Sequence, residues 1–282
     1  MNKELEWLSK HRKGGTQQYK NPELALVYYR KALLIEPMDH KSFLSLIDCL
    51  ESLGKEKQAK AILRRLITLF PSSDHRQVYL QRLGKLILNQ KKKYKKAKKY
   101  FRLALKRNSC LDLRIYELGM DNAQIGNYEK AIVCFQSCTK KSSIRHLSMN
   151  SLGFAHFHQG KFSFAIKEYK NTLRIKPDYY LAYMNWVLVL ICEQKYEESE
   201  EMFRKGLENM KSNSNYYCSS FTKLVKIYEN EKKRIEKGLG AVLNEEQQKL
   251  QEIKYNGIKQ MQTLLNNEIE KLKKIESNKK LF

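Results

Sequence analysis

The side chains that could do chemistry lie far apart in this sequence of 282 residues. Cys134 and Cys138 are one helical turn apart and could share a metal ion, but no second pair or histidine cluster completes four ligands. His156 and His158 are two residues apart, so on a helix they point to different sides. The Gly-Gly-Thr segment at 14–16 follows His-Arg-Lys instead of a strand, which indicates a turn. We therefore predict no catalytic residues, metal or cofactor, and a chain that is not an enzyme.

Composition favours helices over strands with tight turns. The sequence has 4 prolines and 12 glycines, and is 42% hydrophobic and 30% charged. The six cysteines form no CxxC pair, which indicates a reduced, intracellular protein. The N-terminus lacks the apolar run of a secretion signal, and the longest apolar stretch, of about 14 residues, is shorter than the ~20 that span a bilayer. We expect a cytoplasmic location, with the nucleus or the cilium and cytoskeleton as alternatives.

Small residues recur along the chain with a fixed period. Four of the five intervals between them are 34 residues, and the fifth is 38. A larger side chain follows four residues after each small residue, and a further position follows after seven, so all three lie on one face of a helix. Each repeat therefore buries one stripe of its second helix, centred on Ala25, Ala59, Ala97, Ala131, Ala165 and Ser199.

The other half of each unit repeats too. Leu-Gly pairs stand at 118–119 and 152–153, turn glycines follow at Gly126 and Gly160, and Pro37, Pro71 and Pro177 end three of the second helices. This pattern resembles the tetratricopeptide repeat over residues 1–213, best at 112–145 and 146–179. The resemblance implies an all-α, right-handed α-solenoid whose helix pairs stack because no pair covers its own apolar face. It also implies a scaffold or adaptor for protein complexes.

The repeat pattern predicts three segments. Residues 1–39 form a divergent N-terminal helix pair, in which Glu4, Trp7 and Leu8 belong to an irregular capping helix. Residues 40–213 hold five repeats, and 214–282 hold a capping helix and a long amphipathic helix that begins at Asn244, with Gln247 at the capping-box position. The apolar stripe of the last helix either folds back along the solenoid, forms a coiled coil with another chain, or lies on a membrane surface.

In the family that the sequence resembles, the first helix of each pair lines a concave groove. Carried over position by position, the groove is apolar and aromatic in its centre and suits an amphipathic helix or an extended peptide. Part of it could instead be core, above all if the C-terminal helix fills it. A clamp for the C-terminal carboxylate of a chaperone is not expected, because the positions that match its lysines and asparagines hold Tyr116, Met120 and Phe154. The predicted groove residues are Tyr116, Met120, Asn150, Phe154, Phe157, Met184 and Leu188.

A basic run at 91–107 stands out in a chain whose net charge is +24. The buried stripe of this segment is already supplied by Tyr94, Ala97, Phe101 and Ala104, and like charges one turn apart each cost a few tenths of a kcal/mol, so the run suggests an acidic partner. Alternatives are RNA or another nucleic acid, acidic tubulin tails in a ciliary or microtubule complex, an accessory role in an enzyme complex, nuclear import, or a merely solvated face. The predicted basic patch comprises Lys95, Lys96, Lys98, Lys99, Arg102 and Lys106.

Overall fold

Helices make up the regular structure of the described residues. The computed structural model describes residues 10–11, 15, 21–72, 74–90, 93–106, 111–138, 142–209, 222, 225–226, 228–230, 232–233, 235–237 and 244–279. No strand occurs in those ranges. Consecutive helices pack in pairs, so the predicted all-α chain of stacked helix pairs is confirmed. The capping residues Glu4, Trp7 and Leu8 lie outside the described ranges.

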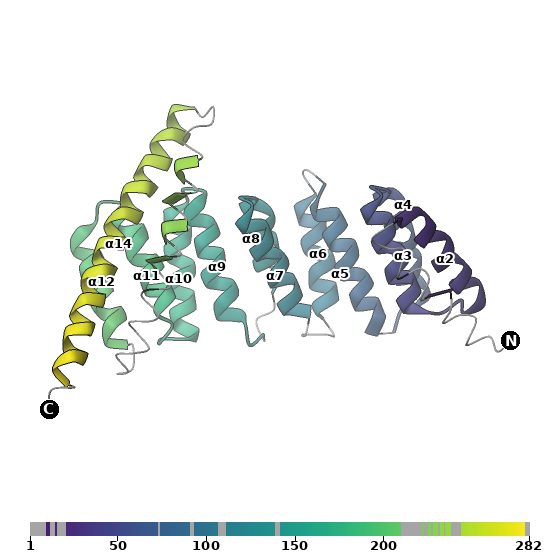
Figure 1. The fold of residues 1–282 in the computed structure, drawn as a ribbon, viewed down its shortest axis with the longest axis horizontal. Coiled ribbons are helices and arrows are strands. Elements are labelled where there is room, and N and C mark those ends of the chain that lie inside the picture. The colour runs from purple at the N-terminus through teal and green to yellow at the C-terminus, as the bar shows by residue number, and fades with distance from the viewer. Residues whose placement is uncertain are drawn as a thin grey trace. The chain divides into compact units, whose positions relative to one another are not determined.

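The chain forms two compact units (Figure 1), and each is described by itself. The first unit comprises residues 1–119 with 137–142, and within it each helix packs on the next, from α2 to α6. The segmentation predicted from the repeats, at 39 and 213, stays a prediction. The helices of the first unit are α2 (Pro22–Ile35), α3 (His40–Ser52), α4 (Glu56–Leu69), α5 (Asp74–Leu88) and α6 (Tyr94–Leu105).

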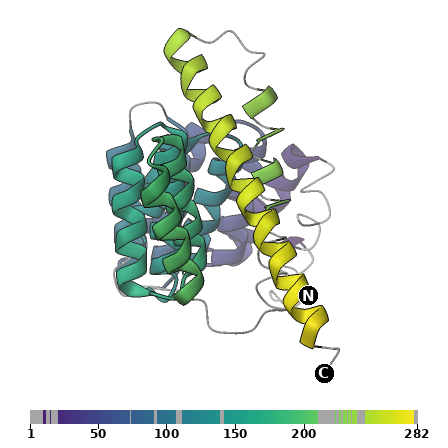
Figure 2. The ribbon, with the colours of Figure 1, turned by 90° about the vertical axis from the view of Figure 1, so that its left-hand side faces the viewer.

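The second unit comprises residues 120–136 and 143–282, and α7 (Leu111–Gln124) runs from the first unit into it. Helix α9 packs on α8 and α10, while α11 packs on α10, α12 and the long C-terminal helix α14. Figure 2 shows α14 passing obliquely over this unit. Its helices are α8 (Tyr128–Phe135), α9 (Arg145–His158), α10 (Phe162–Ile175), α11 (Tyr180–Cys192), α12 (Tyr196–Asn209) and α14 (Glu245–Lys279).

The Leu-Gly positions of the first helices explain why the pairs pack closely. A Cβ atom at Gly84 would lie 2.7 Å from the ring of Phe101, and one at Gly153 would lie 2.5 Å from the ring of Tyr169. Each aromatic ring therefore rests directly on the backbone of the preceding helix. The small residues of the second helices, such as Ala97, are fully buried, as the period predicts. Close approach at both sites is what makes a pair of helices one packing unit.

Helix ends follow local chemistry. Asp39 accepts hydrogen bonds from the backbone N–H groups of Lys41 and Ser42, which caps α3. Gly126 and Gly160 have φ angles of 80° and 73°, in the left-handed region that suits glycine, so both end first helices of pairs as predicted. The predicted start of the last helix is also confirmed.

That start is a reciprocal capping box. The backbone N–H of Gln247 donates to Asn244 Oδ1 at 2.8 Å, and the backbone N–H of Asn244 donates to Gln247 Oε1 at 3.2 Å. Helix α14 then runs for 35 residues and buries Ile258, Met261 and Leu265 in the core of the second unit. The apolar stripe of α14 thus packs against other helices of the same chain.

Candidate protein-binding surfaces

The predicted groove residues of the second unit differ widely in their exposure. Met184 and Leu188 on α11 are 0% and 2% exposed, and Phe157 on α9 is 1% exposed. Met120 and Phe154 are half-buried, and the hydroxyl of Ser151 lies 3.7 Å from the Met120 sulfur. In the first unit, Tyr116 is half-buried. The apolar groove predicted on α11 is therefore part of a packed core.

Helix α14 covers part of α11 and so helps to bury the predicted groove residue Leu188. Gly257 lies against α11 so closely that a Cβ atom there would overlap the Cys192 Sγ atom, and would meet Leu188 at 3.7 Å. Lys254 is 2% exposed, and its ammonium group donates to the backbone carbonyl of His158, the last residue of α9, at 2.6 Å. A cation at this position also matches the negative end of the α9 dipole. Of the three predicted fates of the C-terminal helix, the structure shows the fold-back.

Asn150, predicted to face a partner, instead begins a buried chain of hydrogen bonds. Its Oδ1 accepts from Asn185 Nδ2 at 3.2 Å, and Asn185 Oδ1 accepts from the hydroxyl of Tyr228 at 3.3 Å. Burial, with the nearby Cys192 and Tyr180, raises the pKa of Tyr228 above its usual range, so this hydroxyl stays protonated and can donate. The chain links α9, α11 and the segment before α14.

The first unit carries an ionic cluster on its first helices. The guanidinium of Arg82 on α5 joins the Asp48 carboxylate on α3, at 2.5 Å for Nη1–Oδ1 and 3.4 Å for Nη2–Oδ2. The Glu51 carboxylate lies 3.9 Å from Arg82 and 3.8 Å from Lys85. Burial raises the pKa of Glu51, and the two cations oppose that rise. The facing sides of α3 and α5 thus carry charged, partly exposed side chains.

The predicted basic patch lies on α6 in the first unit. Five of its six side chains are exposed, and Lys98 is half-buried; burial, assisted by the Arg102 charge, lowers the pKa of the Lys98 ammonium. Ala97, Phe101 and Ala104 are fully buried, so this stripe accounts for the packing of α6. The packing of α6 therefore does not require the lysines of the patch.

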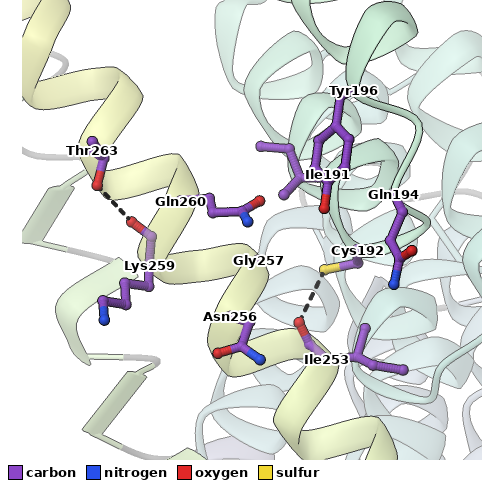
Figure 3. Close-up of a pocket in the computed structure, with 10 residues that line it drawn as sticks. All are labelled: Ile191, Cys192, Gln194, Tyr196, Ile253, Asn256, Gly257, Lys259, Gln260 and Thr263. Atoms are coloured by element: carbon purple, nitrogen blue, oxygen red, sulfur yellow. Dashed lines mark hydrogen bonds between the residues drawn. The ribbon is translucent and has the colours of Figure 1, made fainter.

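A pocket of about 470 Å³ lies where α14 meets the end of α11 and the start of α12 (Figure 3). The Cys192 thiol faces it and lies 3.8 Å from the Ile253 carbonyl. Burial raises the pKa of Cys192 to about 12, although Lys254 opposes the rise. The thiol is therefore neutral and a poor nucleophile. The other lining residues are Ile191, Gln194, Tyr196, Asn256, Gly257, Lys259, Gln260 and Thr263.

Comparison with known proteins identifies the repeat. Sequence models of the tetratricopeptide repeat match residues 41–73 and 79–109. The chain contains tetratricopeptide repeats. The two matches cover α3 with α4, and α5 with α6, that is, two helix pairs of the first unit. The two matches do not include residues 112–179, where the sequence best fits the repeat pattern.

Several solved tetratricopeptide-repeat structures are similar to the chain. A structure of MamA has 21% identity, covers 58% of this chain and 94% of its own, and has a TM-score of 0.35. A repeat protein from Parabacteroides merdae has 16% identity, coverages of 88% and 98%, and a TM-score of 0.41. The yeast Sti1 TPR2AB domain in complex with an HSP90 peptide has 13% identity, coverages of 72% and 90%, and a TM-score of 0.35. No curated protein sequence matches the chain. At sequence identities and TM-scores this low, no binding partner of these proteins can be assigned to this chain.

Two features are absent from the part of the chain that the structure describes. No group of three or more His, Cys, Asp or Glu side chains there is arranged to hold a metal ion. None of the described helices combines the length and the apolar character needed to cross a membrane.

Four residues of these surfaces escaped prediction from the sequence. Arg82 follows Asp48 by 34 residues, one repeat period, so the period itself could have paired them. Lys254 stands four residues before Ile258 and seven before Met261, on the apolar stripe of α14, which marks a lysine that must be buried. Asn185 carries no comparable local signal. Tyr228 belongs to the segment predicted as a capping helix, but its spacing there does not indicate a hydrogen bond to Asn185.

Proposed function

We propose that the chain is a non-enzymatic scaffold or adaptor that binds other proteins through the helical surfaces of its repeats. Repeat arrays of this kind present extended surfaces that their own core does not use. The observation that carries the proposal is the face of α6, where a complete buried stripe leaves the patch lysines to solvent. Positive charge at this density attracts an acidic polypeptide.

The ionic cluster of Asp48, Glu51, Arg82 and Lys85 supports a second, polar recognition surface on α3 and α5. Asp48, Glu51 and Lys85 stand at positions that would face the groove in this family, and the side chains of the cluster are only partly buried. In the second unit, considered by itself, the half-buried Met120 and Phe154 offer apolar contacts to a helix or a peptide. The buried Phe157 and Leu188, which lie against α14, could join such a site only if α14 moved away. Met184 lies against α12.

A binding titration of the full chain tests the proposal. The probes are a 20-residue poly-glutamate peptide and a single-stranded RNA of equal charge, each measured by fluorescence anisotropy over a range of salt concentrations. The test variant is K95E/K96E/K99E/R102E, and the control is K167E/K170E/R174E/K176E on α10. Both change the net charge by the same amount, and all the replaced side chains are exposed.

We expect the α6 variant to lose binding of poly-glutamate at least tenfold more than the α10 variant. Equal loss in the two variants would mean that binding follows net charge alone, which contradicts the proposal. If instead RNA binds with a steep salt dependence, poly-glutamate does not bind, and the α6 variant loses RNA, the nucleic-acid alternative replaces it.

A further inference from the structure

Helices α6 and α12 are the second helices of two different repeats, and their buried faces follow the same pattern. In both, the small residue, Ala97 or Ser199, is preceded three residues earlier by tyrosine and followed four residues later by phenylalanine. Positions seven and eight also agree in type, as alanine or glycine and then leucine. Ala97, Ala104, Ser199 and Gly206 are buried in their helices. The two helices therefore present equivalent outer faces.

The charges on those outer faces are opposite, position by position. At two residues and one residue before the small residue, and at one, two and nine residues after it, α6 carries lysine where α12 carries glutamate. All five glutamates are exposed, and so are four of the five lysines. The matched pairs are Lys95 with Glu197, Lys96 with Glu198, Lys98 with Glu200, Lys99 with Glu201, and Lys106 with Glu208.

Packing of the repeat does not require these charges. At the same five positions α10 carries Ser163, Phe164, Ile166, Lys167 and Arg174, a mixture of polar, apolar and basic residues. A uniform charge is therefore a property of the two surfaces and not of the fold. For α12 it is also unexpected, because five of the chain's 30 acidic residues gather on one helix of a protein with net charge +24.

Local electrostatics leave most of these charges without a counter-charge. Within the described residues, Lys95, Lys96, Lys99 and Lys106 have no ion pair, and neither do Glu197, Glu200 and Glu208. On the α12 face, Glu201 pairs with Lys205 at 2.5 Å, and Glu198 interacts electrostatically with Lys195. The lysines of α6 also stand near the positive end of their helix dipole, which is unfavourable. An acidic surface docked there would relieve both effects.

We propose that the acidic face of α12 in one copy of the chain docks on the basic face of α6 in a second copy. The inference rests on the proposed role of the α6 face in protein binding, and names its acidic partner. The charges stand at the same positions in both helices, so a roughly parallel contact sets Lys95, Lys99 and Lys106 opposite the α12 face, because these three point directly away from the buried stripe. Lys96 and Lys98 lie on the two flanks of that contact. At physiological ionic strength the Debye length is about 8 Å, which screens the repulsion between two net-positive chains but not close pairs.

Such a contact joins two different surfaces, so it is heterologous. Each copy in a pair keeps one unused face, and further copies can add head to tail into rings or open chains. Exposed ion pairs are individually weak and sensitive to salt. The association is therefore expected to depend on protein concentration and to disappear near 1 M salt, where the Debye length falls to about 3 Å.

Sedimentation equilibrium of the full chain tests this proposal with two charge reversals. The variant K95E/K96E/K98E/K99E makes both faces acidic, and E197K/E198K/E200K/E201K makes both basic. Each is expected to stay monomeric at physiological ionic strength, where the unchanged chain associates. An equimolar mixture of the two is expected to associate again, because the acidic α6 of one then meets the basic α12 of the other.

The controls separate this contact from general charge effects. K167E/K170E/R174E/K176E changes the net charge as much as the α6 reversal but is expected to keep the association, and circular dichroism reports whether each variant is folded. Should a reversed helix fail to fold, E197Q/E198Q/E200Q/E201Q, which removes the charges without reversing them, must still weaken the association. A monomeric unchanged chain, or a mixture that stays monomeric, overturns the proposal.

The result also separates this proposal from the proposed function. If the chain is monomeric at every salt concentration while α6 reversal still abolishes poly-glutamate binding, the α6 face binds proteins but not a second copy. If the chain associates through α6 and α12 but does not bind poly-glutamate, the face is specific for α12, and the more general role in binding acidic partners is wrong.

Discussion

The ammonium group of Lys254 donates a hydrogen bond to the backbone carbonyl of His158 over 2.6 Å, and joins residues 96 positions apart in the sequence. The Lys254 side chain is almost fully buried and also lies 5.9 Å from the ring centroid of Phe157. This contact holds the C-terminal helix at the end of α9, where the unpaired carbonyls of a helix need donors. A buried lysine so placed fixes the register of α14 on the repeats.

Replacement of Lys254 should therefore loosen α14. We expect Lys254→Ala to lower the free energy of unfolding by about 2 kcal/mol, because a hydrogen bond from a charged donor contributes roughly 1.5–3 kcal/mol. Lys254→Met keeps the length of the stem and should cost less. Urea denaturation with hydrogen exchange of α14 measures both. An unchanged exchange rate of α14 in Lys254→Ala would contradict this role.

Gly257, the one glycine of α14, lies where this helix closely approaches α11. Alanine would normally favour a helix by about 1 kcal/mol over glycine. Here we expect Gly257→Ala to destabilise the second unit by about 1–3 kcal/mol, because its Cβ atom would overlap the Cys192 Sγ atom and overpacking costs that much.

A second substitution tests the cause. In a Cys192→Ala background the obstructing sulfur is absent, so Gly257→Ala should become neutral or stabilising there. The difference is measured as a double-mutant cycle from urea denaturation curves. Additive effects of the two substitutions would show that the close contact is not responsible.

Arg82 ties α3 to α5 through two carboxylates. We expect Arg82→Met to lower the stability of the first unit by about 1 kcal/mol, since these pairs are partly exposed and screened by solvent. Lys85→Met, which removes a longer contact of 3.8 Å, should have a smaller effect.

The same variant should change the response to pH. The folded-state pKa of Glu51 is raised, so the folded chain binds that proton more tightly than the unfolded chain, and stability contributed at this site rises as pH falls through the folded pKa. Loss of the Arg82 cation should strengthen that rise. Denaturation midpoints at pH 7 and pH 4.5 measure it, and an identical pH response in the variant would argue against the cluster.

A histidine cluster gives the first unit the opposite dependence on pH. His40 stacks on His75 with ring centroids 3.8 Å apart, and its Nδ1 is hydrogen-bonded to the hydroxyl of Tyr79. Burial, with the His75 charge, lowers the pKa of His40, although Asp39 opposes the shift. A lowered histidine pKa means that stability is complete above the unfolded value of about 6.5 and is lost as pH falls through the folded value.

His75→Gln tests this pH dependence, because it removes the like charge and leaves the burial of His40. We expect the variant to lose less stability than the unchanged chain between pH 7 and pH 5. Hydrogen exchange of α3 and α5 at the two pH values follows the first unit directly. A greater loss in the variant would show that the stacked ring stabilises protonated His40.

The sequence by itself determined the helix pairs and their turns. Small residues such as Ala97 at a 34-residue period, glycines at turns and the Asn244 capping box act within one repeat or one helix end, so local spacing suffices to predict them. The position of the α6 lysines outside the buried stripe follows from the same helical period.

Only the tertiary structure decided what covers the predicted groove. Leu188 is a groove position by its place in its own repeat. It is nevertheless buried against α14, which starts more than 50 residues later in the chain. Asn150 likewise turned out to bond Asn185 inside the protein. Contacts between segments so distant depend on how whole surfaces fit together, and no residue spacing along the chain encodes that fit. For this reason the repeats could be predicted, while the docking of α14 through Lys254 and Gly257 could not.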